Sequence, residues 1–247
     1  GSQGGEVAQD AAPDATLAIG VDIDAQGRVS LSSPGNQDGA GLAEPPGPDD
    51  VALILHTSGT TSRPKRVPLT HGNLAASVGN IVETYGLTPD DVSLCIMPLF
   101  HVHGLVASTL ATLASGGTVV VPPRFNALNL WRTAQDYGVT WFTAVPTMHQ
   151  ALLSRARSTQ RSSPQTPPYQ GLRFICSCSA SLPAATMLEM EERFGVPVLE
   201  AYGMTEASHQ MSSNPLPPGN RLPGSVGKGT GVSIAIMDEG GTLQSPG

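Results

Sequence analysis

The stretch Val51-Ala-Leu-Ile-Leu-His-Thr-Ser-Gly-Thr-Thr-Ser-Arg-Pro-Lys65 carries the strongest structural signal in this chain. Its first five residues are apolar and predict a buried strand. Its last nine residues hold five hydroxyl side chains, one glycine and one lysine. Backbone N–H groups and hydroxyls in such a loop form a concavity that binds anions, and the lysine adds a positive charge. The stretch therefore predicts a strand that ends in a polyphosphate-binding loop; a flexible Ser/Thr turn is the weaker alternative.

This loop differs from the Walker phosphate-binding loop. The Walker pattern, Gly-x-x-x-x-Gly-Lys-Ser/Thr, requires a second glycine directly before the lysine. Arg63-Pro64 stand at that place instead. Kinase or ATPase chemistry of the Walker class is therefore disfavoured.

The composition limits the class of protein. Of 247 residues, 39% are hydrophobic and 13% are charged, which is enough for a sizeable core. Residues 1–50 hold nine acidic side chains and one basic, whereas residues 51–247 hold eleven acidic and twelve basic, so the net charge of −7 belongs to the N-terminal part. With no basic stripe and no apolar run of spanning length, we expect neither a nucleic-acid partner nor a membrane span.

The domain organisation follows from a change in composition. Residues 1–48 form an acidic leader rich in Gly and Pro, with a possible hairpin where two apolar runs flank Asp24–Gly27. Residues 49–247 alternate between strand and helix patterns. Because the chain begins Gly-Ser without Met and ends Ser-Pro-Gly, we expect a fragment.

The alternation predicts an α/β fold with a mostly parallel sheet and helices on both faces. Strands are predicted at 51–57, 92–97, 118–121, 139–145, 172–178 and 198–202, with a further one at 232–237. Helices are predicted at 71–85, 103–115, 126–137, 147–157 and 183–194, the last with Ser181 as a possible cap and Gly195 just past its end. Ligands bind beyond the carboxyl ends of parallel strands, so four loops should meet there: 57–66, 98–104, 178–183 and 202–209.

The second and third loops each have a simple structural alternative. His101 and His103 follow a strand, where two imidazoles can bind a metal, but the sequence offers no third ligand. For either histidine, capping the start of a helix is an equally simple interpretation. Ser179-Ala180-Ser181 let the backbone approach a flat ring closely, although taken alone they indicate no more than a helix N-terminus.

The fourth loop combines three different chemical groups. Tyr202 offers a stacking face, Thr205 a hydroxyl that can donate to phosphate, and Glu206 a hard oxygen ligand suited to Mg²⁺. A lone loop carboxylate is usually solvated surface. Beside a phosphate-binding loop, Glu206 becomes a candidate metal ligand.

Two of these loops, in this order and at this separation, resemble the best-known signatures of the adenylate-forming enzymes. The signatures are Thr57–Lys65 and Tyr202–Glu206, and Pro98–Gly104 resembles the histidine motif between them. Ser179–Ser181 resembles the loop that flanks adenine in these enzymes. The superfamily comprises acyl-CoA synthetases, luciferases and peptide-synthetase adenylation domains, and the resemblance covers roughly residues 49–247.

Longer stretches of the sequence resemble one branch of this superfamily, that of oxalate–CoA ligase and peroxisomal coenzyme A synthetase. They lie at 56–65, 98–105, 177–182, 204–209 and 211–217. The resemblance implies that 49–247 is the central part of the large N-terminal domain and that the C-terminal lysine-bearing domain is absent, so the fragment alone should be inactive. One departure is Arg66, which stands where the family usually has glycine.

The resemblance also implies ATP, Mg²⁺ and coenzyme A as reactants and cofactors, and a location in the cytoplasm or peroxisomes. Cys176 and Cys178, which lie on one predicted strand and point the same way, are interpreted as buried free thiols and agree with such a reducing compartment. Catalytic roles are implied for Lys65, Thr205, Glu206 and His101, with Glu206 as the Mg²⁺ ligand. The implied nucleotide-binding residues are Thr57, Ser58, Gly59, Thr60, Thr61, Ser62, Lys65, Ser179, Ala180, Ser181, Tyr202, Gly203 and Thr205.

The histidines favour a small, polar acid as the substrate. Oxalate is a dianion whose pocket needs hydrogen-bond donors, whereas a fatty-acid tunnel needs apolar walls. His101, His103, His209 and Ser179 fit the first need, which makes oxalate the leading hypothesis. A medium-chain fatty-acyl or aryl-CoA ligase is the alternative enzyme, and a truncated nucleotide- or partner-binding module without turnover is the alternative outside catalysis.

Overall fold

The computed structural model describes residues 20–23, 29–32, 45–57, 64–159 and 168–245. The chain divides into two compact units, Gly1–Pro45 and Pro46–Gly247. In the first unit, β1 (Gly20–Ile23) and β2 (Val29–Ser32) pair antiparallel.

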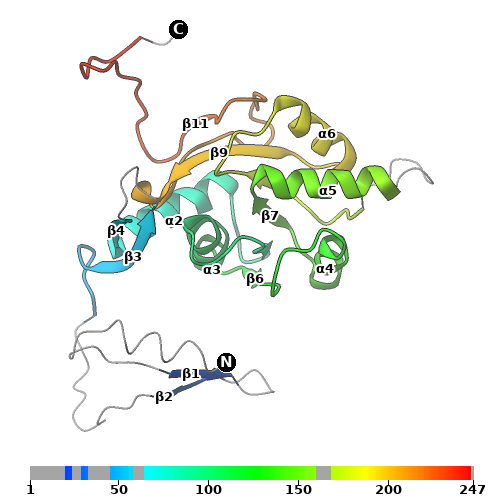
Figure 1. The fold of residues 1–247 in the computed structure, drawn as a ribbon, viewed down its shortest axis with the longest axis horizontal. Helices are drawn as coiled ribbons and strands as arrows, with labels where there is room; N and C mark the ends of the chain where they lie inside the picture. Colours follow the sequence, from blue (N-terminus) through cyan, green and yellow to red (C-terminus); the bar gives the residue numbers. More distant parts are fainter. Residues whose placement is uncertain (1–19, 24–28, 33–44, 58–63, 160–167, 246–247) are drawn as a thin grey trace. The chain divides into compact units, whose positions relative to one another are not determined.

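The second unit is built on a seven-stranded sheet with the order β11-β10-β9-β8-β7-β5-β6 (Figure 1). The five strands from β6 to β9 run parallel, and β10 and β11 add antiparallel at one edge. The mostly parallel α/β fold is thus confirmed. The strand bounds are β5 (Val92–Leu94), β6 (Thr118–Val120), β7 (Trp141–Ala144), β8 (Phe174–Ser177), β9 (Val198–Met204), β10 (His209–Ser213) and β11 (Lys228–Gly229).

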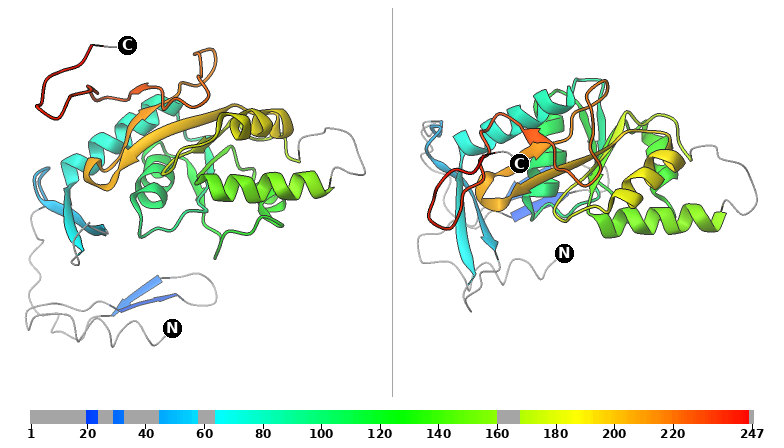
Figure 2. Two further views of the ribbon diagram at one scale, coloured as in Figure 1. Left: turned by 45° about the horizontal axis from the view of Figure 1, so that its top comes forward. Right: turned by 90° about the horizontal axis from the view of Figure 1, so that it is seen from above.

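Helices cover both faces of this sheet (Figure 2). One face carries α2 (His71–Tyr85) and the π-helix η1 (His103–Leu110), which continues as α3 (Ala111–Ala114). The other face carries α4 (Leu130–Tyr137), α5 (Pro146–Thr159) and α6 (Ala184–Phe194).

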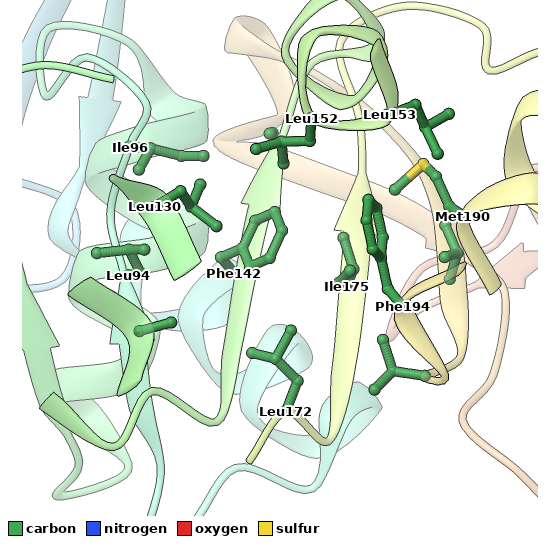
Figure 3. Packing of buried hydrophobic residues seen from close by; sticks show 14 of the residues in the cluster. Leu94, Ile96, Leu130, Phe142, Leu152, Leu153, Leu172, Ile175, Met190 and Phe194 are labelled. Carbon is green, nitrogen blue, oxygen red and sulfur yellow. The ribbon is translucent and has the colours of Figure 1, made fainter. Parts of the chain in front are cut away.

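The core forms because both faces of the central strands are apolar. Successive strand side chains point to opposite faces. Trp141 and Phe174 therefore pack under α2 and η1, with their rings stacked at a centroid distance of 5.3 Å. Phe142 and Ile175 point the other way, into the cluster with α4, α5 and α6 (Figure 3). Burial on both faces is what a parallel sheet with crossover helices requires.

The strand β3 (Val51–Thr57) corrects one expectation. It was expected in the main sheet, but it pairs antiparallel with β4 (Lys65–Thr70) in a separate two-stranded ribbon. The physical reason is the short connection that follows it. Antiparallel strands can be joined by a tight loop, whereas a parallel neighbour needs a crossover of a dozen or more residues.

The ends of two helices show their capping residues, and those of α6 can be compared with the residues expected from the sequence. Thr70 caps α2 through a reciprocal pair of hydrogen bonds with Asn73, each 3.1 Å long. Gly195 ends α6 in the left-handed conformation, as predicted. The expected cap at Ser181 is wrong, because the N-cap position of α6 is Pro183 and it has no side-chain cap.

Three further element predictions need correction. The helix expected over 103–115 is a π-helix for its first eight residues. The helix expected from residue 126 begins at Leu130, since the Asn126 side chain accepts from the Leu128 N–H in a preceding turn. The strand expected at 232–237 is reduced to one bridge between Met237 and Leu243 within the described residues.

Candidate functional site

A cavity of about 570 Å³ lies where the four predicted loops meet. Each loop contributes side chains to its wall, although β3 and β4, which flank the first loop, lie outside the parallel sheet. The lining residues are Thr57, Lys65, Met97, His101, Val102, His103, Val145, Ser179, Gly203, Met204, Thr205, Glu206 and His209.

The predicted site residues fall into three groups. Nine of them line the cavity, namely Thr57, Lys65, His101, His103, Ser179, Gly203, Thr205, Glu206 and His209. Ala180, Ser181 and Tyr202 are exposed and do not belong to its wall. The five residues from Ser58 to Ser62 lie outside the described residues.

His103 is the most firmly held side chain of the wall. It opens η1 and is 2% exposed. Its Nδ1 lies 2.9 Å from Ser179 Oγ, and its Nε2 lies 2.7 Å from Thr143 Oγ1. Burial, and after it the neighbouring imidazole of His209, holds the pKa of His103 well below its usual value. The ring is therefore neutral at pH 7 and fixed by two hydrogen bonds.

His209 faces His103 across the site, with the ring centroids 5.2 Å apart. It is buried, and neither ring nitrogen has a hydrogen-bond partner among the described residues. Burial lowers the pKa of His209 to about 4. A buried polar group without a partner carries a desolvation cost that a ligand can relieve. His209 is thus ready to hydrogen-bond a bound molecule.

The backbone near His209 is closely packed. Gly203 on β9 pairs with Gln210 of β10, and the carbonyl of His209 lies directly over its Cα. A Cβ at position 203 would overlap that carbonyl. Only glycine permits this approach, so Gly203 determines where His209 sits.

Four other residues of the lining carry groups suited to phosphate. Lys65 lies opposite Thr57 at the end of the β3–β4 ribbon. Thr205 and Glu206 lie in the short 3₁₀ helix η3 (Thr205–Ala207) between β9 and β10. A lysine, two hydroxyls and a carboxylate in the lining of one cavity match the chemistry of a bound polyphosphate with its cation.

Arg66 follows the lysine inside β4, where it pairs with His56. Among the described residues, the non-glycine positions with positive φ are Ser179, Ser208 and His209 only, so Arg66 has an ordinary extended backbone. A glycine is not required there. The departure from the family pattern at Arg66 therefore leaves the geometry of the ribbon intact.

The predicted site residues did not include four that line the cavity, Met97, Val102, Val145 and Met204, nor Thr143 behind it. Val145 directly follows β7 and lines the cavity, and the rule on carboxyl strand ends could have found it. Thr143 lies inside β7 and contacts the cavity only through His103. No motif signals a residue of that kind, because its role depends on what packs above the strand.

The model of the AMP-binding enzyme family matches residues 5–247 of this chain. The chain belongs to this family. It is 55% identical over 202 residues to an oxalate–CoA ligase of Arabidopsis thaliana, and 50% identical over 198 residues to an oxalate–CoA ligase of Saccharomyces cerevisiae. These alignments cover 81% and 80% of the chain, but only 38% and 35% of the two relatives.

A solved structure agrees with the family assignment. The ATP-bound MatB of Rhodopseudomonas palustris superposes with a TM-score of 0.72 at 36% identity, covering 82% of this chain and 39% of that one. The chain thus spans less than two fifths of the length of these proteins. Within the described part of the chain, no helix has both the length and the apolar content needed to cross a membrane.

Proposed function

We propose that this chain carries the nucleotide- and acid-binding part of an oxalate–CoA ligase. In such an enzyme a carboxylic acid is activated by ATP and then transferred to coenzyme A. The observation that carries the proposal is one cavity that joins Lys65 and Thr205 to the buried imidazoles of His103 and His209. Two relatives named oxalate–CoA ligase, at 55% and 50% identity, support it. In this proposal residues 49–247 form part of the adenylation domain.

The acid-binding end favours a small dianion. The neutral imidazole of His209 has one N–H without a partner among the described residues, and Ser179, held 2.9 Å from His103, adds a hydroxyl. An alkyl chain placed against these groups would leave them without partners, at a cost of about 1–3 kcal/mol each. A fatty-acyl substrate is therefore disfavoured by desolvation.

The reaction depends on positioning more than on covalent catalysis by the protein. An oxygen of the acid attacks the α-phosphorus of ATP, and pyrophosphate leaves; the thiol of coenzyme A then displaces AMP. Lys65 would hold the outer phosphates, and Thr205 would donate to the α-phosphate. Held in one cavity, acid and nucleotide react as if within one molecule.

Glu206 fits the Mg²⁺ proposal because magnesium commonly takes only one or two protein carboxylates and completes its coordination with water and phosphate. Its side chain is exposed and lines the cavity beside Thr205. Mg²⁺ held there would neutralise charge on the phosphates. Location in the cytoplasm or peroxisomes suits three buried free cysteines.

The test is acid-dependent exchange between ATP and pyrophosphate, measured on the protein expressed from its complete reading frame. We expect faster exchange with oxalate than with octanoate, and a loss of at least about 100-fold in Lys65→Met, whose charge lies in the cavity. The matched control is Lys228→Met, an exposed lysine of β11 outside the cavity. Faster exchange with octanoate than with oxalate would contradict the proposal.

A further inference from the structure

A line of hydrogen-bonded side chains runs beneath the cavity, in the layer between the sheet and the helices α2 and η1. It begins at Ser179, whose hydroxyl lies 2.9 Å from His103 Nδ1, and continues from His103 Nε2 to Thr143 Oγ1 at 2.7 Å. Thr143 lies opposite Cys176 in the register of β7 and β8, and its hydroxyl lowers the pKa of that thiol, which burial raises. Cys176 Sγ in turn lies 3.3 Å from the hydroxyl of Tyr85.

The protons along this line can be assigned from its far end. The Tyr85 hydroxyl donates to Gln210 Oε1 at 2.9 Å, so its oxygen is available to accept from Cys176. Thr143 then has one proton and two possible acceptors, the sulfur of Cys176 and the Nε2 of His103. A thiol sulfur is a weak acceptor, whereas an imidazole nitrogen is a strong one. Thr143 should therefore donate to Nε2.

This assignment decides which nitrogen of His103 carries the proton. A neutral imidazole has one N–H and one lone pair. If Nε2 accepts from Thr143, the proton sits on Nδ1 and is donated to Ser179 Oγ. The hydroxyl proton of Ser179 is then free to point into the cavity. With the other tautomer, Nδ1 would accept that proton, and Ser179 would present only lone pairs to an anion.

We propose that Thr143 is a positioning residue, which fixes the tautomer of His103 so that Ser179 donates its hydroxyl proton to a carboxylate of the substrate; this inference rests on the proposed function of the site. Thr143 itself is 2% exposed and does not line the cavity. Its effect reaches the substrate through two intervening side chains. The backbone at Ser179, with φ of 70°, holds the last of these in place.

The tautomer can be measured directly on the intact chain. The ¹⁵N resonances of the His103 ring, identified by their loss in His103→Gln, should show the proton on Nδ1. In Thr143→Val, which keeps the shape of the side chain but removes the hydroxyl, we expect the Nε2–H form to become populated. Thr143→Ser restores a hydroxyl at the same place and should restore the Nδ1–H form, which a merely structural role would not predict.

Binding provides the second measurement, with oxalate as the probe. Thr143→Val should weaken oxalate binding by roughly 10- to 100-fold, the worth of one hydrogen bond to a charged group, with little change in ATP affinity. Thr143→Ser should bind oxalate like the unmodified chain. The unfolding midpoints of both variants report whether the strand remains folded.

The outcomes separate the two proposals. A proton on Nε2 in the unmodified chain, or no change of tautomer and oxalate affinity in Thr143→Val, would overturn the role of Thr143. If the unmodified chain does not bind oxalate, the proposed substrate is overturned instead. The tautomer measurement decides the role of Thr143 in either case, because it needs no substrate.

Discussion

At the scale of single residues, backbone strain is concentrated in the cavity region. The non-glycine residues with positive φ in the described part of the chain are Ser179 at 70°, Ser208 at 56° and His209 at 108°. Such conformations cost about 1–3 kcal/mol each and persist only where packing enforces them. Ser179 and His209 both line the cavity. The strain therefore lies where side chains must point at a ligand.

Gly203→Ala tests this close packing. Because a Cβ would overlap the His209 carbonyl, we expect the unfolding free energy to fall by about 1–3 kcal/mol and oxalate affinity to fall with it. Urea unfolding and oxalate titration measure the two effects.

The control for that variant is Gly79→Ala, inside α2. A Cβ at Gly79 meets nothing within 4 Å, so this change should raise the unfolding free energy by about 0.5–1 kcal/mol. If both glycine variants were equally stable, the overlap at Gly203 would not be real.

At the scale of elements, the helix η1 places His103 in the wall. Its π-type turns are uncommon and occur frequently at functional sites. Gly104 allows this start, since a Cβ there would lie 2.7 Å from the carbonyl oxygen of Met97. The tight approach of the helix to the preceding loop brings His103 over Thr143.

The helix α2 gives a prediction about element stability. Thr70 ends β4 and caps α2 through Asn73, so Thr70→Ala should lower the unfolding free energy by about 1 kcal/mol. Thr70→Ser keeps the hydroxyl and should cost much less. Chemical denaturation measures both, and equal losses in the two variants would show that the cap is not the cause.

At the scale of the whole molecule, buried neutral imidazoles make stability depend on pH. Burial lowers the pKa of His149 and of His209 to about 4, from 6.5. Between these values the unfolded chain binds more protons than the folded one, so the unfolding free energy falls as pH falls. Each histidine contributes a loss of about 2 kcal/mol between pH 7 and pH 5.

His149→Leu isolates one of these contributions. In this variant the unfolding free energy should fall between pH 7 and pH 5 by about 2 kcal/mol less than it does in the unmodified chain. Chemical denaturation at the two pH values measures both losses. His56→Gln, at an exposed position of β3, should keep the original pH dependence. An unchanged pH dependence in His149→Leu would mean that His149 is not held neutral by burial.

Much of the fold followed from local patterns. The helix predicted over 71–85 has the bounds of α2, and its two ends carry the cap residues Thr70 and Gly86. The pairing of β3 with β4 was not predicted. An apolar run looks the same in the sequence whether its strand pairs in an antiparallel ribbon or lies in a parallel sheet. The nine predicted residues that line the cavity come from loops whose motifs are local, whereas Thr143 has no motif at all.

The sequence by itself determined the α/β alternation, the family to which the chain belongs and the set of polar groups that meet in the cavity. These depend on residue order, which periodicity and motifs record directly. The tertiary structure alone decided that β3 leaves the sheet for a ribbon, that Gly203 sets the position of His209, and that Thr143 contacts His103. Each of these features depends on which segments of the chain pack against one another. A local sequence pattern does not determine such contacts.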